Sequence, residues 1–197
     1  MWRVPGMAVW LFAAPSLAAQ WSVGGEVGML RFWGTAVDTT TSQDPASTRP
    51  SPSTSYALRV QRRFGALGVG IGVLYSRMGV GAENGAVAVE EKGLVKLYEI
   101  APEVSLLVAK PGPGGALRVH AGPVFDRWSP IGGKDMRRVG ARAAVALEWL
   151  LGGRWIGTLQ GGAAVSASVL RAEDLPAEFA PRATWRRGVS AGISLRL

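Results

Sequence analysis

Apolar side chains recur at every second position through most of the chain after residue 20. The pattern is clearest in residues 67–78, where valine, isoleucine and tyrosine alternate with glycine and serine. A period of two is that of a β-strand with two unlike faces, whereas a helix repeats its apolar positions every three or four residues. No segment is long and apolar enough to be a membrane-spanning helix. If this chain enters a membrane, it must do so as strands.

Eight segments carry the alternation. They cover residues 21–33, 55–64, 67–78, 94–109, 117–128, 138–150, 154–168 and 185–197. Pro102 lies on the apolar face of the fourth segment, and because proline has no N–H for a ladder, we expect a bend or bulge there.

The links between these segments alternate in length. Long links at 34–54, 79–93 and 170–184, with a medium one at 129–136, alternate with tight ones at 65–66, 110–115 and 151–153. This asymmetry is typical of bacterial outer-membrane barrels, in which periplasmic turns are short and outer loops are long. The prediction is an all-β fold, a closed antiparallel up-and-down transmembrane β-barrel of about eight strands.

Residues 1–19 have the pattern of a signal peptide. A single positive charge at Arg3 precedes an apolar stretch at 7–14 and small residues at 16–19. Cleavage is expected after Ala18 or Ala19, and an N-terminal membrane helix is disfavoured because the apolar run is far below the ~20 residues of a span. Residues 20–197 then form one barrel domain in the cell outer membrane.

Charge and composition exclude several functions. The 22 basic and 14 acidic residues give a formal charge of +8, but the basic residues form no stripe with interleaved aromatics, so no nucleic-acid partner is expected. The chain has no cysteine and one histidine, which leaves no disulfide, no thiolate metal site and no expected cofactor.

The polar face of the strands is expected to fill the barrel. An eight-stranded barrel has an interior just wide enough for side chains, so buried charges there must pair with one another. Glu103 and Arg118 fall near the same inner end of neighbouring strands. The predicted lumen network consists of Glu26, Arg59, Glu99, Glu103, Arg118, His120, Arg142, Glu148 and Arg196.

His120 admits two interpretations. As a general base it would suit a lipid-modifying enzyme, but its predicted direction is into the lumen, away from lipid. A structural, hydrogen-bonding histidine is favoured, and the protein is not expected to be an enzyme.

Aromatic residues gather at predicted strand ends, as in the two girdles of membrane barrels. The outer girdle is predicted to contain Trp33, Tyr56, Tyr75, Phe125, Trp128 and Trp185. The inner girdle is predicted to contain Trp21, Phe64, Trp149 and Trp155.

With these features the chain resembles the small bacterial outer-membrane barrels of the OmpA and OmpX type and, more loosely, the porin-like outer membrane protein beta-barrel families. The most specific part of the resemblance is residues 188–197, which look like the C-terminal signal read by the barrel assembly machinery. They depart from it by ending in Leu197 in place of an aromatic residue.

The leading functional hypothesis is a monomeric barrel with a structural or surface-interaction role, its interior plugged by Glu/Arg pairs. The alternatives are a narrow pore for small solutes, a lipid A-modifying enzyme, and a soluble lipocalin-like barrel whose apolar face points inward. The polar loop 35–54 is either a solvated connection or a binding surface. Outer-membrane lipid and lipopolysaccharide are the expected partners, through phosphate contacts of Lys134, Arg137, Arg138, Arg182, Arg186 and Arg187.

Overall fold

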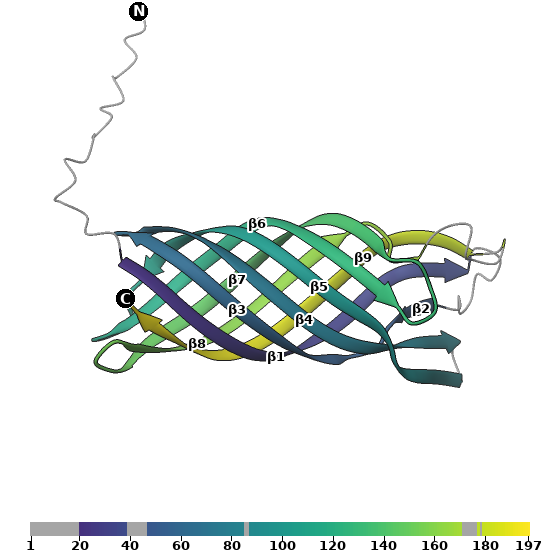
Figure 1. Ribbon diagram of the computed structural model, residues 1–197, viewed down its shortest axis with the longest axis horizontal. Helices are drawn as coiled ribbons and strands as arrows, with labels where there is room; N and C mark the ends of the chain where they lie inside the picture. Colours follow the sequence, from purple (N-terminus) through teal and green to yellow (C-terminus); the bar gives the residue numbers. More distant parts are fainter. Residues whose placement is uncertain (1–19, 39–46, 85–86, 171–176, 178) are drawn as a thin grey trace, which may run out of the picture.

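A computed structural model describes residues 20–38, 47–84, 87–170, 177 and 179–197. These residues form one antiparallel sheet that closes on itself, because β1 pairs with β9 as well as with β3 (Figure 1). Its strands are β1 (Gln20–Asp38), β2 (Ser47–Pro50), β3 (Ser53–Phe64), β4 (Leu67–Asn84), β5 (Val87–Ala109), β6 (Gly115–Pro130), β7 (Met136–Gly152), β8 (Trp155–Ser166) and β9 (Phe179–Arg196). Within this part of the chain, no helix is long and apolar enough to cross a membrane.

The short strand β2 continues the line of β3. It pairs with the outer ends of β1 and β4, the same two strands that flank β3. The break between them is bridged by Ser51, whose N–H donates to the Gly79 carbonyl at 3.0 Å and whose Oγ accepts from the Gly79 N–H at 2.8 Å. The nine labelled strands therefore form the eight positions of a closed up-and-down barrel.

Several strands are longer than the alternation predicts. β4 runs to Asn84 and β5 starts at Val87, so most of the expected loop 79–93 is a paired hairpin that projects from one end of the barrel (Figure 1). β2 lies within the expected link 34–54. Beyond the apolar band both faces of a strand contact water, so backbone pairing continues without alternation in the sequence.

The bulge expected at Pro102 is not found, although the pairing of β5 with β6 is interrupted from Ala101 to Glu103. Ile100 lies opposite Phe125 and Val104 lies opposite Ala121, so the β5–β6 register is the same on both sides of the proline and no residue is inserted. A β-carbon added at Gly122 would lie 2.0 Å from the Pro102 carbonyl oxygen. The missing side chain at Gly122 lets the two strands approach without a bulge.

The short turns and the two ends of the described barrel lie together. The turns from β3 to β4 and from β7 to β8 have two residues each, and Gly65 in the first has the positive φ of 62° that such a turn requires. Figure 1 shows the C-terminus and the start of β1 at this end, which we call the inner end; the long β4–β5 hairpin lies at the opposite, outer end.

The two faces of the sheet have opposite polarity. Outward side chains of the strands are large and apolar, with exposed fractions such as 66% for Leu58 and 63% for Val139. Inward side chains are polar and buried, such as Glu103 and Ser105. An apolar outer surface of this extent requires an apolar surrounding phase. A lipocalin-like barrel has the reverse polarity, so that alternative is wrong.

Candidate functional site: the barrel lumen

Inward residues of β5 and β6 divide the lumen into levels. From the outer end inward, β5 presents Leu97, Glu99, Glu103 and Ser105, whereas β6 presents Trp128, Asp126, His120 and Arg118. Because inward positions recur every second residue, the sequence of each strand fixes the order of these levels. An apolar level therefore lies outermost, and three charged levels follow it.

The apolar level is a packed cluster that we call the cap. Trp128 and Leu97 are completely buried in it, and the rings of Phe32 and Trp128 meet edge to face with centroids 5.9 Å apart. Its buried members are Leu30, Phe32, Met78, Leu97, Trp128 and Val169. The cap fills the outer part of the lumen with side chains that cannot hydrate an ion.

The first charged level joins four strands. Arg186 of β9 donates to Asp126 of β6 through two nitrogens, at 3.0 and 3.1 Å, and also pairs with Glu99 of β5. The second oxygen of Glu99 accepts from Arg142 of β7 at 3.1 Å. Two carboxylates thus balance two guanidinium groups, as buried charges require.

The second charged level is centred on Arg59 of β3. Its Nη1 lies 3.0 Å from Glu26 Oε1 and its Nε lies 3.0 Å from Glu103 Oε1. Glu103 also contacts His120 Nδ1 at 3.1 Å, and Glu26 accepts a hydrogen bond from Ser190 at 2.8 Å.

The third charged level lies closest to the inner end. Glu148 of β7 contacts Arg63 at 2.6 Å and Arg118 at 3.4 Å. Next to it, Gln61 of β3 donates to Ser105. A β-carbon on Gly68 would lie 2.5 Å from Ser105 Oγ, so the glycine makes room for this contact.

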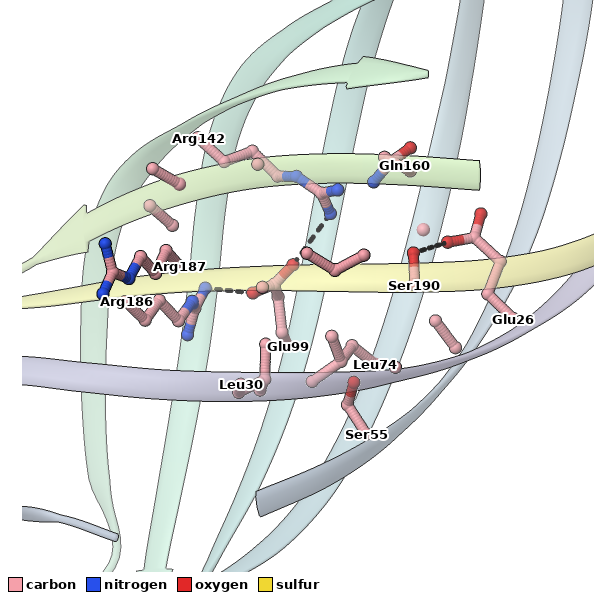
Figure 2. Close-up of a pocket in the computed structure, with 18 of the residues that line it drawn as sticks. Glu26, Leu30, Ser55, Leu74, Glu99, Arg142, Gln160, Arg186, Arg187 and Ser190 are labelled. Atoms are coloured by element: carbon pink, nitrogen blue, oxygen red, sulfur yellow. Dashed lines mark hydrogen bonds and ion pairs between the residues drawn. The ribbon is translucent and has the colours of Figure 1, made fainter. Parts of the chain in front are cut away.

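A cavity separates the first and second charged levels. Figure 2 shows Glu99, Arg142 and Arg186 on one side of it and Glu26 with Ser190 on the other. The volume open to the centre of a water molecule is about 80 Å³ in this cavity. A smaller cavity of about 20 Å³ adjoins Arg63 and Glu148. One water needs roughly 10–15 Å³ by this measure, so the lumen has room for several waters between its levels.

The structure brings together eight of the nine predicted lumen residues. The structure joins Glu26 to Arg59, Glu99 to Arg142, Glu103 to His120 and Glu148 to Arg118. It does not pair Glu103 with Arg118, because the two lie at different levels. Among the described contacts Arg196 has no ion pair, and its buried Nε has no hydrogen-bond partner.

Sequence reasoning missed three members of the network. The alternation places Arg63 and Asp126 on the polar, inward face of their segments, although the predicted network leaves them out. Arg186 was expected at the outer surface with Arg138, but both lie at inward positions of their strands. Arg186 is buried, and Arg138 is half-buried with its Nε bonded to the Ser168 carbonyl. Period counting from Ser190 reaches Arg186 on the inward face.

Nine of the ten predicted girdle aromatics lie on the outward face, and Trp128 does not. Trp128 is wrong as a girdle residue because it stands three positions from the outward Phe125, so their side chains point to opposite faces. Tyr98, which was not assigned to a girdle, lies outward opposite Tyr75 with ring centroids 5.3 Å apart.

Comparisons with known proteins support the same fold. The chain is similar to Neisserial surface protein A, with 14% identity and a TM-score of 0.56 over 90% of this chain and 97% of that one. It is also similar to the outer membrane protein OprG from Pseudomonas aeruginosa, with 9% identity and a TM-score of 0.59 over 91% and 96% of the two chains. No protein-family model and no curated protein matches the sequence. The chain therefore has the fold of the small bacterial outer-membrane β-barrels.

Proposed function

We propose that this protein resides in the bacterial outer membrane as a monomeric, closed barrel whose role is structural or surface-interacting, without solute conduction. The observation that carries the proposal is the filled lumen, in which the cap and three charged levels lie in series between the outer and inner ends. A conducting path would have to pass every one of them.

The buried histidine supports a role other than catalysis. His120 is 1% exposed and its Nδ1 contacts Glu103 inside the barrel, so a lipid substrate outside the wall does not reach it. Among the described residues, no group of three histidine, aspartate or glutamate side chains is placed to bind a metal ion. We assign His120 a structural role in the second charged level.

Delivery to the membrane is part of the proposal. Residues 1–19, which lie outside the described residues, are proposed to be removed as a signal peptide, and residues 188–197 to be read by the barrel assembly machinery. Residues 188–196 belong to β9, the strand that closes the barrel against β1. Mass spectrometry of the mature protein is expected to find an N-terminus at Ala19 or Gln20.

Residence and barrel closure can be tested together. Fractionation of cells expressing the full chain is expected to place the protein in the outer membrane, with a band whose gel mobility changes on boiling. Recovery from the soluble periplasmic fraction would contradict the proposal.

Conduction is tested separately in planar bilayers. The purified barrel is expected to show no single-channel events, whereas Phe32→Ala with Trp128→Ala, which empties the cap, is expected to raise ion leakage. The matched control Trp185→Ala removes an exposed aromatic from the outward face and should leave conductance at zero. Discrete channels in the unmodified protein would favour the narrow pore.

A further inference from the structure

The outward face carries cations at the outer end that the lumen network does not use. Three pairs of them lie directly opposite one another on neighbouring strands: Arg31 with Arg187, Arg77 with Lys96, and Arg127 with Arg137. Directly opposed residues have β-carbons about 4.5–5.5 Å apart, and like charges there destabilise a sheet. Each pair therefore costs stability unless an anion lies between the two cations.

The acidic side chains that the structure describes do not supply that anion to two of the three pairs. Of the carboxylates whose side chains the structure describes, all but Asp135 point into the lumen: Glu26, Glu99, Glu103, Asp126 and Glu148. Asp135 lies in the outer turn and contacts Arg127. The β1–β9 and β4–β5 cation pairs have no acidic partner among these side chains.

The pairs stand at a definite height. Arg31 is ten residues beyond Trp21 on β1, and Arg77 is ten residues beyond Leu67 on β4. Ten residues at about 3.3 Å rise, in strands tilted by about 40°, span roughly 25 Å, which is the height of the apolar band of a membrane barrel. The cations therefore lie where the apolar band ends and headgroups begin.

The inner end lacks this arrangement. In the described strands its outward cation is Arg62, whose guanidinium lies 5.4 Å from the Trp21 ring centroid and 5.0 Å from that of Phe64. The residues opposite Arg62 are Trp21 and Val69, so no second cation faces it. Paired cations are thus a property of one rim.

The β1–β9 pair has the most complete surroundings. Beyond it toward the outer end, Trp33 lies opposite Trp185, and the Arg187 guanidinium lies 4.0 Å from the Trp33 ring centroid. Toward the middle of the band, Met29 lies opposite Val189, and both are more than half exposed. A paired charge above an exposed apolar strip matches an amphiphile with a phosphate headgroup and acyl chains.

We propose that the phosphate groups of lipid A bind between the paired cations of this rim, with Arg31 and Arg187 forming the principal site. The inference rests on the proposed outer-membrane residence, because only there does the outer rim face the leaflet that contains lipopolysaccharide. A doubly charged phosphate between two guanidinium groups converts a repulsive cross-strand pair into two attractive contacts.

The principal test compares R31Q/R187Q with the unmodified protein in neutral detergent, with and without purified lipid A. Retention of lipid A by the immobilised barrel is expected to fall about tenfold in the variant. The difference in unfolding temperature between the variant and the unmodified protein should change sign when lipid A is added. Without lipid A the variant is expected to unfold at an equal or higher temperature. With lipid A the unmodified protein should become the more stable one, because a ligand that binds only the folded state raises stability by mass action.

Two matched variants define the specificity. Arg62→Gln removes an outward cation from the inner rim and is expected to leave lipid A retention unchanged. R127Q/R137Q is expected to reduce retention less than R31Q/R187Q does, because Asp135 already partly neutralises Arg127.

Three outcomes would overturn the inference. These are equal lipid A retention by R31Q/R187Q, equal retention of dephosphorylated lipid A by the unmodified barrel, and complete displacement of lipid A by inorganic phosphate, which would assign the site to the free ion. A heat-modifiable, non-conducting R31Q/R187Q barrel recovered in the outer membrane shows that the proposed function stands when the inference fails.

Discussion

Charged side chains on the two faces of the barrel wall have different neighbours. In the lumen each of the five described carboxylates lies within 4 Å of a cationic group, and Arg186 alone contacts both Glu99 and Asp126. On the outward face at the outer rim, six cations lie opposite one another in three cross-strand pairs. Among the described side chains, the lumen therefore contains its own counter-charges, whereas two of the three cation pairs at the outer rim have no carboxylate beside them.

Breaking the inner arrangement at Glu99 is expected to have the largest effect. Glu99→Leu leaves Arg142 without its carboxylate partner and leaves Arg186 with Asp126 alone, and removal of one partner of a buried pair costs about 3–5 kcal/mol. Urea unfolding of the reconstituted barrel, followed by tryptophan fluorescence, measures this loss. Glu99→Gln keeps hydrogen-bonding capacity and should lose less. A change below about 1 kcal/mol in Glu99→Leu would show that solvent, not Glu99, neutralises these arginines.

The cap and the girdle give a second contrast, between one tryptophan on each face. Trp128→Ala removes a completely buried ring and is expected to cost about 3–5 kcal/mol of the free energy of unfolding. Trp185→Ala removes a ring that is 53% exposed to the surrounding phase, so its cost should be clearly smaller. The same urea assay compares the two, and equal losses would contradict a packed cap.

Adding a charge to the outward face tests where the apolar band lies. Ile71→Arg places a cation near the middle of the band, four residues from Leu67 and six from Arg77, and should cost about 2–4 kcal/mol. Tyr75→Arg places it close to the outer rim, where the expected cost is about 0–1 kcal/mol. Unfolding measured in bilayers of defined lipid should show this gradient. A uniform cost would move the band away from the height assigned to it.

Much of the fold was predictable because successive side chains of a strand point to opposite faces of the sheet. In a closed membrane barrel one face meets lipid and the other the lumen, so the strands can be read from the alternation. Each of the eight alternating segments lies largely within a strand, and the prediction of a closed antiparallel barrel is confirmed. The outer hairpin of β4 and β5 was not predicted, because strands beyond the apolar band need no apolar face. At Pro102 the disturbed ladder was predictable but the absence of a bulge was not, since Gly122, which makes room for the close approach, lies on the next strand.

The lumen network was predictable in kind but not in its pairs. Inward parity identifies which charges enter the barrel, and consistent counting would have included Asp126 and Arg186 and removed Trp128 from the girdle. Which carboxylate meets which guanidinium depends on strand stagger around the closed sheet. Glu103 and Arg118 lie on neighbouring strands, yet at different levels of the lumen. Glu103 contacts His120, whereas Arg118 contacts Glu148 nearer the inner end.

The outer turn offers the smallest and most local test of the contrast, because there a carboxylate outside the lumen does meet an outward cation. Asp135 accepts hydrogen bonds from Ser129 at 2.7 Å and from Arg127, and these contacts lower the pKa of its carboxyl group below the ordinary value. A lowered folded-state pKa means that the contact is fully formed above the ordinary pKa of about 3.9 and is lost as pH falls through the lower, folded-state value. Amide hydrogen exchange in residues 131–135 should therefore speed up only at acidic pH. Asp135→Asn is expected to remove that pH dependence, and its persistence in the variant would assign the change to another group.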